Sequence, residues 1–330
     1  MRSCLGNLFK LGARVHLSFN YAQKRLLQNR AIDGGVRNIF DRKVKQMQKQ
    51  RAVLSPDGHI FEYLKEEVAC SVVDRIADVK RSFPLALDLG CGKGFLAKSL
   101  AQEDGVSMML QGDLCKENVT KAYPSLIPCD GLSFDEENLP FRDNTFDLVL
   151  TSLSLHWVND LQGYFSEVLR ILKPDGCFIG AMFGSDTLFE LRCSLQLAET
   201  EREGGIAPHV SPMMQGHQLA NLLSSAKFNL VTLDFDQLVV NYPSMFELME
   251  DLQGMGESNA LLSRKMLHRD TIIAASAIYQ AMYGDTMENF IPATFQLLHM
   301  IGWKPHETQQ KPLERGAVPK GFNAKEKSQN

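Results

Sequence analysis

The feature that most constrains the fold is a glycine-rich turn that follows a short apolar run. Residues 85–89 are apolar except for Asp88, which is typical of a buried strand, and Gly90, Gly92 and Gly94 come directly after them. Glycines let the backbone turn tightly and approach a ligand closely, and the helix expected next offers free N–H groups at its start. The segment therefore predicts a strand–turn–helix unit with a ligand site at the carboxyl end of the strand.

The alternation of strand and helix continues along the chain. Further apolar runs of strand length recur, residues 161–172 have the apolar spacing of a helix, and a turn is expected at 173–176. Strands that alternate with helices pair in parallel through right-handed crossovers, so residues 61–183 are expected to form an open, doubly wound, Rossmann-like α/β sheet. The strands expected after the first are 106–110, 126–132, 146–153 and 177–183.

Beyond residue 183 strands and helices no longer alternate regularly. Residues 185–203 predict one helix, and residues 243–283 predict two helices separated by a turn-rich stretch. A strand pair is expected at 228–241 and a late strand at 293–303. The predicted architecture is therefore a mostly parallel sheet with a helical insertion and a C-terminal antiparallel strand.

The N-terminal segment differs in charge from the rest of the chain. Residues 1–32 contain six lysines and arginines and no acid, with apolar residues among them at helical spacing. Such a segment is typical of a mitochondrial transit peptide, and a solvated basic tail is the alternative. Without it the chain has 29 basic and 39 acidic residues, a net charge of −10. The expected organisation is a transit peptide at 1–33, a linker or arm at 34–60, the core at 61–183, a helical insertion with closing strands at 184–310 and a flexible tail at 311–330.

Charge and cysteine content exclude several classes of protein. The whole chain has a formal net charge of −4, which gives no electrostatic reason to expect a nucleic-acid partner. No stretch approaches the roughly 18 apolar residues of a membrane-spanning helix. The seven cysteines are odd in number and none has C-x-x-C spacing, so we expect no disulfide framework, no zinc site and a reducing compartment.

The glycine turn itself favours one kind of ligand. Its G-x-G-x-G spacing differs from the G-x-G-x-x-G pattern of dinucleotide-binding loops, and an acid at position 88 would repel a pyrophosphate. A cationic or zwitterionic ligand with an amino-acid portion fits this turn better. S-adenosyl-L-methionine is such a ligand.

Two further acidic positions follow the second and third predicted strands. Asp113 has the position of an acceptor for both ribose hydroxyls, or of a helix N-cap. Asp135 and Glu136 have the position of an acceptor for the amine of adenine, or belong to a solvated acidic loop. Because ligands of open α/β sheets lie at the carboxyl ends of the strands, we expect Asp88, Asp113 and Asp135 or Glu136 to converge on one site.

These segments together resemble the motif series of class I S-adenosylmethionine-dependent methyltransferases. The resemblance covers residues 60–183 and includes the segments 87–94, 135–141, 151–157 and 172–176. It implies S-adenosyl-L-methionine as the cofactor, with its methionine part held by the turn. The cofactor-binding residues that it implies are Asp88, Gly90, Gly92, Gly94, Asp113, Asp135, Glu136 and Ser152.

A closer resemblance covers nearly the whole chain from residue 38. The sequence is similar to the assembly factor 5 family of mitochondrial NADH:ubiquinone oxidoreductase (complex I), with little match near 261–265 and after 316. This resemblance implies hydroxylation of an arginine in a matrix-side core subunit of complex I, which would be the protein substrate. It also implies peripheral association with the matrix face of the mitochondrial inner membrane and other assembly factors as partners. The segments that carry it are 38–42, 157–160, 178–183, 186–188, 190–205, 242–243, 246–259, 267–270 and 301–304.

No motif in the sequence by itself predicts hydroxylation, and the sequence does not identify the catalytic residues. His156 follows the fourth predicted strand and is a candidate base, although a packed structural histidine is an equal alternative. Iron-dependent oxygenases need two histidines and a carboxylate, and His268-x-Asp270 has suitable spacing, with His299 or His306 downstream. Helical flanks would put His268 and Asp270 on different faces, so no metal site is predicted.

Three other functions therefore stay open beside arginine hydroxylation. The first is methyl transfer to a protein or to a carrier-bound carboxylate, with the pocket aligning a nucleophile and the sulfonium methyl group. The second is a non-catalytic assembly chaperone that keeps the pocket as part of its fold. The third is a metal-dependent hydroxylase built around His268 and Asp270.

Overall fold

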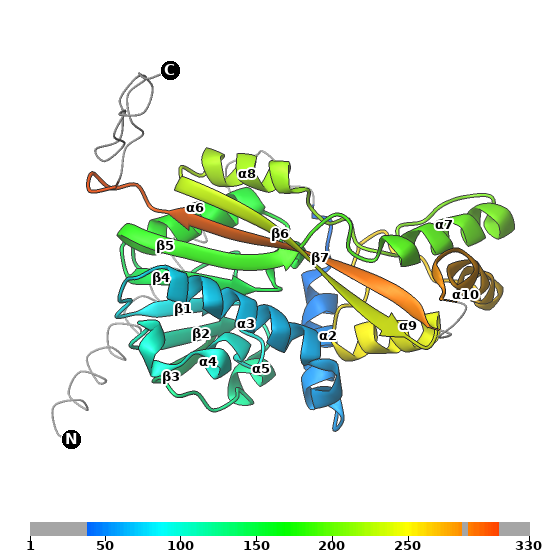
Figure 1. Cartoon of the computed structure of the whole chain (residues 1–330), viewed down its shortest axis with the longest axis horizontal. Coiled ribbons are helices and arrows are strands. Elements are labelled where there is room, and N and C mark those ends of the chain that lie inside the picture. Colours follow the sequence, from blue (N-terminus) through cyan, green and yellow to red (C-terminus); the bar gives the residue numbers. More distant parts are fainter. Residues whose placement is uncertain (1–37, 286–289, 310–330) are drawn as a thin grey trace, which may run out of the picture.

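A seven-stranded sheet in the order β3-β2-β1-β4-β5-β7-β6 forms the centre of the molecule (Figure 1). The computed structural model describes residues 38–285 and 290–309, so the expected transit peptide and tail lie outside the described residues. The strands are β1 (Ala86–Leu89), β2 (Met109–Asp113), β3 (Cys129–Ser133), β4 (Phe146–Ser152), β5 (Leu172–Phe183), β6 (Asn229–Tyr242) and β7 (Ile291–Trp303).

The first five strands are parallel, and β7 runs antiparallel between β5 and β6. This confirms the predicted Rossmann-like α/β class with a C-terminal antiparallel strand. The apolar runs place β1, β2, β3 and β4 to within about three residues. Strand β2 begins at Met109, because Val106 makes only an isolated bridge to Phe83.

Two local predictions about the later strands are wrong. The turn expected at 173–176 is a bulge inside β5, because Leu172 pairs with Phe146 and the ladder resumes at Cys177. Asp175 takes a positive φ of 65° there. The strand pair expected at 228–241 is the single strand β6, whose partner is the distant β7.

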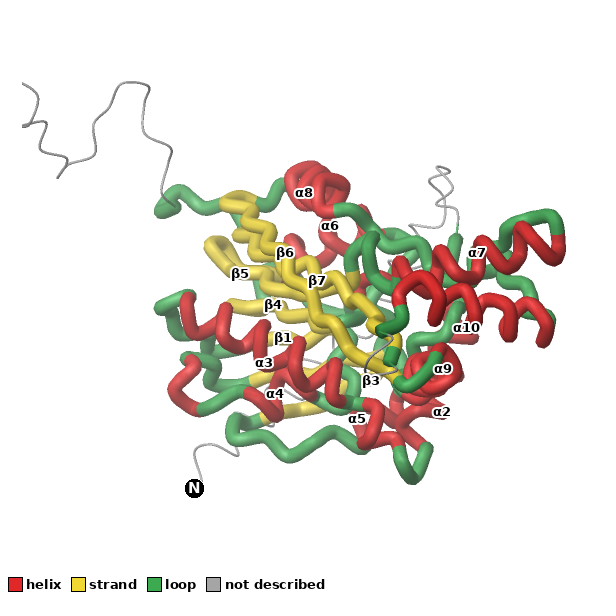
Figure 2. Tube along the Cα trace, turned by 45° about the vertical axis from the view of Figure 1, so that its right-hand side comes forward, coloured by secondary structure: helices red, strands yellow, loops and turns green. Residues whose placement is uncertain are grey.

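Helices cover both faces of the sheet (Figure 2). The pleat sends Leu148 and Leu150 to the face that packs on α3 and α4, and Val149 to the face that packs on α6 and α8. The helices are α2 (Arg42–Leu54), α3 (Tyr63–Asp78), α4 (Phe95–Ser99), α5 (Lys116–Thr120), α6 (Leu161–Ile171), α7 (Phe189–Glu203), α8 (Gly216–Ser225), α9 (Met245–Gly254) and α10 (Arg269–Tyr283).

The insertion extends beyond the end of the sheet. Helices α7 and α10 pack against each other and project from the core in Figure 1, and the predicted helices at 185–203 and within 243–283 are present as α7, α9 and α10.

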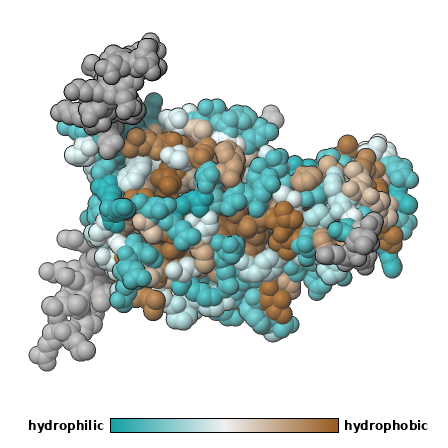
Figure 3. Space-filling view, viewed as in Figure 1, coloured by the Kyte–Doolittle hydropathy of each residue, from teal (hydrophilic) through white to brown (hydrophobic). Residues whose placement is uncertain are grey.

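The face of the molecule drawn in Figure 3 shows separate apolar areas among hydrophilic ones. Strand β6 has exposed apolar side chains, among them Phe235 and Val239. No helix within 38–285 or 290–309 is long and apolar enough to cross a membrane.

The segment expected to be a linker or arm contains a helix. Helix α2 begins after Asp41, whose carboxylate accepts a hydrogen bond from the Val44 amide and caps the helix. It packs against α5 and α9, one from the core and the other from the insertion. Helix α2 therefore joins the N-terminal segment to both parts of the molecule beside the carboxyl ends of the strands.

Candidate functional site

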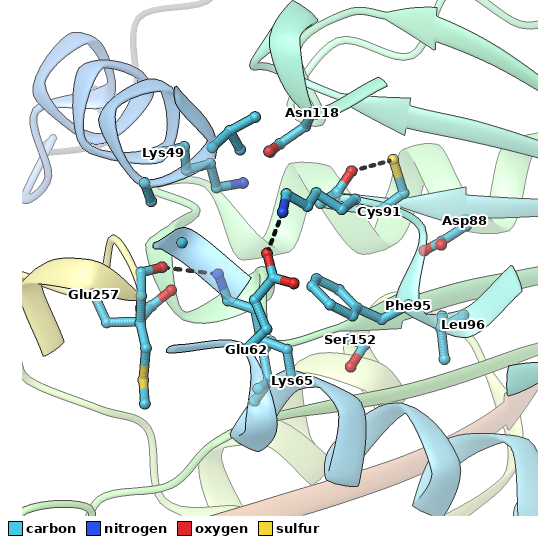
Figure 4. Close-up of a pocket in the computed structure, with 18 of the residues that line it drawn as sticks. Lys49, Glu62, Lys65, Asp88, Cys91, Phe95, Leu96, Asn118, Ser152 and Glu257 are labelled. Carbon is cyan, nitrogen blue, oxygen red and sulfur yellow. Dashed lines mark hydrogen bonds and ion pairs between the residues drawn. The ribbon is translucent and has the colours of Figure 1, made fainter. Parts of the chain in front are cut away.

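A cavity of about 680 Å³, part of it open to solvent, lies at the carboxyl end of β1 (Figure 4). Its walls come from the glycine turn, α2, α3 and the segment after α9. The charged side chains that line it are Lys49, Glu62, Lys65, Asp88, Lys93 and Glu257.

The glycine turn has the conformation that its composition predicts. Gly90, Gly92 and Gly94 have φ values of 73°, 56° and 77°, in the left-handed region that favours glycine. A Cβ on Gly90 would lie 2.1 Å from Ser154 Oγ, whereas one on Gly92 would meet nothing nearer than Phe95 at 3.4 Å. The turn at Gly92 therefore leaves its backbone accessible on the cavity side.

Asp88 lines the cavity from the end of β1. Its side chain is buried, and neither carboxylate oxygen has a hydrogen-bond partner among the described residues. Burial, together with the nearby charges of Asp113 and Glu136, raises the pKa of Asp88 well above its ordinary value. Because an unpaired buried carboxyl is costly, its two oxygens need donors, and a ligand in the cavity can supply them.

Asp113 and Glu136 approach the same place from the next two strands. Lys49 Nζ lies 3.4 Å from Asp113 Oδ2 and 3.6 Å from Glu136 Oε1. Asp113 also accepts hydrogen bonds from the amides of Gly92 and Cys115, and Glu136 accepts one from Ser154. The structure therefore brings Asp88, Asp113 and Glu136 together, as the sequence predicts, with Lys49 between two of them.

Asp135 points to a different partner. Its carboxylate accepts a hydrogen bond of 2.8 Å from Arg42 in α2, and its side chain is 38% exposed. Asp135 does not line the cavity. Of the two residues that the sequence offers for the adenine amine, Glu136 thus lies closer to the Asp88 and Asp113 carboxylates.

The sequence-predicted residues divide into two sets. Asp88, Gly90, Gly92 and Ser152 line the cavity, whereas the others support it from behind or lie outside it. The residues that do not line it are Gly94, Asp113, Asp135 and Glu136. Gly94 packs against Gln111, because a Cβ at this position would lie 2.3 Å from Gln111 Nε2.

Sequence reasoning missed the side chains that close the cavity opposite the turn. Glu62, at the start of α3, pairs with Lys93 at 2.6 Å and accepts a hydrogen bond from Tyr123. Lys65 donates to the carbonyl of Met255 at 2.8 Å. Figure 4 shows Glu62 and Lys65 on α3 and Glu257 on the neighbouring loop. Residues 42–51, within the expected arm, contain five lysines and arginines, and this basic run is the one sequence signal for this wall because it includes Lys49.

His156 is not placed to act on a ligand in the cavity. Its side chain is buried and does not line the cavity. The distance from His156 Nε2 to Glu257 Oε2 is 3.1 Å. Burial lowers the pKa of His156, although Glu257 opposes the shift. This geometry matches the packed structural histidine that the sequence left as the alternative.

The histidine–aspartate pair at the start of α10 does not form a metal cluster with the downstream histidines. His268 is the N-cap residue of α10 and Asp270 lies in its first turn. Within 38–285 and 290–309, no three His, Cys, Asp or Glu side chains lie close enough to hold a metal ion. His299 is buried in β7 with neither ring nitrogen hydrogen-bonded.

Comparison with known proteins connects this site to a family. A family model described as a methyltransferase domain matches residues 87–180, which include the glycine turn and β4. The mouse protein named arginine-hydroxylase NDUFAF5, mitochondrial, is 54% identical over 286 residues, covering 86% of this chain and 83% of the mouse protein. The human protein of the same name is also 54% identical, with 86% and 82% coverage. The chain belongs to the NDUFAF5 arginine-hydroxylase family.

Membership of the NDUFAF5 family agrees with the resemblance in the sequence and marks the chain as an enzyme built on a methyltransferase-type domain. A candidate methyltransferase of Bacillus halodurans, solved at 1.95 Å, has a TM-score of 0.50 and 15% identity to this chain. The match covers 72% of this chain and 99% of that structure. At this identity the likeness concerns the fold, and it agrees with the class I methyltransferase-like architecture.

Proposed function

We propose that this NDUFAF5 relative is a mitochondrial arginine hydroxylase that binds S-adenosyl-L-methionine and acts in the assembly of complex I. The observation that carries the proposal is its 54% identity, over most of both chains, to relatives named arginine-hydroxylase. The substrate is an arginine in a matrix-side core subunit of complex I, as the sequence resemblance implies.

The cavity fits S-adenosyl-L-methionine on the chemistry of its residues. The unpartnered carboxyl of Asp88 suits the ammonium of the methionine part, and the accessible backbone at Gly92 suits close approach of the same part. Asp113 and Glu136 are acceptors for ribose hydroxyls and an adenine amine. When bound, the cofactor would supply an electrophilic methyl group on a sulfonium ion, which serves methyl transfer. Hydroxylation of arginine inserts an oxygen atom and is a two-electron oxidation, so it also requires dioxygen together with a two-electron reductant as co-reactants.

The residues of the chain would bind the cofactor and orient it. Asp88 and Ser152 line the cavity and would contact the cofactor there. Asp113 at the end of β2 and Glu136 in the loop after β3 lie behind Lys49 and would hold polar groups of the cofactor once that side chain has moved. Phe95 and Leu96 supply apolar wall beside the turn. The arrangement supports cofactor binding by a rigid sheet edge, with the closing wall contributed by α2 and α3.

The proposed location is the matrix face of the mitochondrial inner membrane, with peripheral attachment and with other assembly factors as further partners. The curated relatives are named mitochondrial, and residues 1–32 have the charge pattern of a transit peptide. The acidic net charge without that segment suits a basic target peptide.

Methyl transfer is the second candidate function, because the matched family model is that of a methyltransferase domain. Its acceptor would be a protein or a carrier-bound carboxylate in contact with the cavity. A non-catalytic assembly chaperone is the third, and it predicts that cofactor-site variants still support assembly.

Mass spectrometry of complex I subunits from cells with and without this protein tests the proposal. Hydroxylation predicts an arginine heavier by about 16 Da that disappears with the protein, whereas incorporation of a tritiated methyl group would support transfer. The matched variants are Asp88→Ala, in the cavity, and Asp74→Ala, exposed on α3. Normal assembly with Asp88→Ala, although the arginine modification is lost, would show that assembly needs the protein and not the modification. An arginine modification that persists in Asp88→Ala would contradict a hydroxylase that uses this cavity.

A further inference from the structure

Lys49 occupies the position between the two carboxylates assigned to the nucleoside. It projects from α2, and its ammonium lies 3.4 Å from Asp113 Oδ2 and 3.6 Å from Glu136 Oε1. Its side chain is only 14% exposed. Burial disfavours its charged form, but Asp113 and Glu136 outweigh that effect and hold the pKa of Lys49 above its ordinary value. The lysine is therefore a charged partner of both acids.

The Lys49 ammonium and the donor groups of a nucleoside would bind to the same two carboxylates. An ammonium donates three hydrogen bonds and accepts none, while a carboxylate accepts and does not donate. Ribose hydroxyls and an adenine amine are donors that seek the same oxygens. The lysine also lines the cavity that the ligand would enter. Asp113 Oδ2 already accepts from the Gly92 amide and the Lys49 ammonium, so a nucleoside donor that bonds to this oxygen takes the place of the ammonium. Glu136 Oε1 makes no hydrogen bond among the described residues and lies 3.6 Å from the same ammonium.

The rest of α2 is held by contacts outside this pair. Gln46 donates to the carbonyl of Leu114 at 3.1 Å, and Gln50 donates to Glu117 at 2.8 Å. Lys45, one turn before Lys49, lies 3.3 Å above the ring of Trp157 and donates to the carbonyl of Gly256. Positions four apart on a helix share a face, and the charges of Lys45 and Lys49 repel each other. Displacement of the Lys49 ammonium therefore changes the electric field at Lys45 and at the Trp157 ring beside it.

We propose that Lys49 is a tethered competitor of the cofactor's nucleoside, exchanging its ammonium on Asp113 and Glu136 for the ribose and adenine donors when the cofactor enters. The inference rests on the proposed cofactor site and adds a specificity element to it. A ligand without a donor-bearing nucleoside cannot displace the lysine. Entry of a ligand with one displaces the Lys49 ammonium and changes the electric field at Lys45 and Trp157.

Substitution of Lys49 removes the competitor and makes a measurable difference. Lys49→Gln leaves Asp113 and Glu136 free to accept from the ligand, so S-adenosylhomocysteine should bind about tenfold more tightly, which corresponds to about 1.4 kcal/mol. The same change leaves Asp113 without the Lys49 cation and Glu136 with Arg42 alone, 3.9 Å away, so the unliganded variant should melt at a lower temperature than the wild type. Lys43→Gln removes the same charge from an exposed position of the same helix and should leave the affinity unchanged.

Calorimetric titration of S-adenosylhomocysteine into the full-length wild type, Lys49→Gln, Lys43→Gln and Asp88→Asn tests the exchange. Tighter binding by Lys49→Gln alone supports it. Unchanged or weaker binding by Lys49→Gln, with binding lost in Asp88→Asn, overturns the exchange and leaves the proposed cofactor site standing. Failure of both the wild type and Lys49→Gln to bind removes the cofactor site and this inference with it.

Fluorescence supplies a second measurement that keeps Lys49 in place. The chain has two tryptophans, so Trp303→Phe leaves Trp157 as the sole reporter beside α2. The exchange predicts that S-adenosylhomocysteine changes the Trp157 emission of this protein, and that adding Lys49→Gln reduces the change. Saturating ligand with no effect on Trp157 emission would contradict displacement of the Lys49 ammonium.

Discussion

Trp157 and Glu257 are joined by a hydrogen bond of 2.7 Å from the indole Nε1 to Oε2 of the carboxylate. Trp157 follows β4 in the core, and Glu257 follows α9 in the insertion. The same carboxylate oxygen lies 3.1 Å from His156 Nε2, and Glu257 also lines the cavity. One buried carboxylate thus fixes the insertion against the core at the wall of the candidate site.

Glu257→Gln should lower stability most at neutral pH. Burial alone would raise the pKa of Glu257, but Lys45, the His156 hydrogen bond and Lys65 lower it from 4.5 to about 2. A lowered acid pKa stabilises the fold above the unfolded-state value, by about 3 kcal/mol here, and the gain is lost as the pH falls from 4.5 to about 2. Urea unfolding from pH 7 to pH 2.5 measures it.

The control for that series is Glu250→Gln, which removes a carboxylate from an exposed position of α9. Its unfolding free energy should differ from wild type by less than about 0.5 kcal/mol at every pH. A Glu257→Gln variant whose deficit stayed constant down to pH 2.5 would show that lost packing, and not the ionised carboxylate, causes the destabilisation.

Asp88→Asn should stabilise the unliganded protein while it weakens ligand binding. Burial raises the pKa of Asp88, so its contribution to stability is present below the unfolded value of 3.8 and is lost as the pH rises through the folded-state value. The amide removes that penalty, so the variant should melt a few degrees above wild type at pH 8 and show little advantage at pH 4. Thermal melts at both pH values, with S-adenosylhomocysteine titrations, test the prediction. Equal melting temperatures at pH 8 would contradict an uncompensated carboxyl.

Gly90→Ala and Gly92→Ala should differ in stability although both positions have positive φ. Alanine in this conformation costs about 1 kcal/mol at either site. At Gly90 the new Cβ also meets Ser154 Oγ at 2.1 Å and disturbs its hydrogen bond to Glu136, which adds about 1–3 kcal/mol. Denaturant unfolding of the two variants should therefore rank Gly90→Ala as the less stable. The reverse order would contradict the packing of the turn against Ser154.

The core of the fold was predictable because its signals are local. The apolar runs of β1 and β4 are buried on both faces, so composition alone identifies them. Strand β6 lies at the sheet edge and is mostly exposed, so its polar sequence resembles two short strands with a turn. Its length is set by pairing with β7, some 60 residues later, which no local pattern encodes.

The residues of the candidate site also differ in whether a local pattern predicts them. Asp88 and the glycines belong to one continuous motif, so sequence places them at the carboxyl end of β1. Lys49 and Glu257 reach the cavity from segments before and after the core, and only tertiary packing of α2 and α9 brings them there. The basic run at 42–51 is predicted to be part of an arm because its own sequence shows no partner for its charges. Those partners are Asp113 in β2 and Asp135 in the loop after β3.

His268→Ala and Asp270→Asn should leave arginine modification within about twofold of wild type. The pair sits two positions apart at the start of α10, and residues at i and i+2 of a helix do not share a face. The described residues bring no third ligand-forming side chain to them. Complementation of deficient cells with each variant, followed by mass spectrometry of complex I subunits, measures the modification. Asp88→Ala provides the loss-of-function reference in the same cells. Loss of the modification in both His268→Ala and Asp270→Asn, at normal protein levels, would favour the metal-dependent hydroxylase that their spacing suggests.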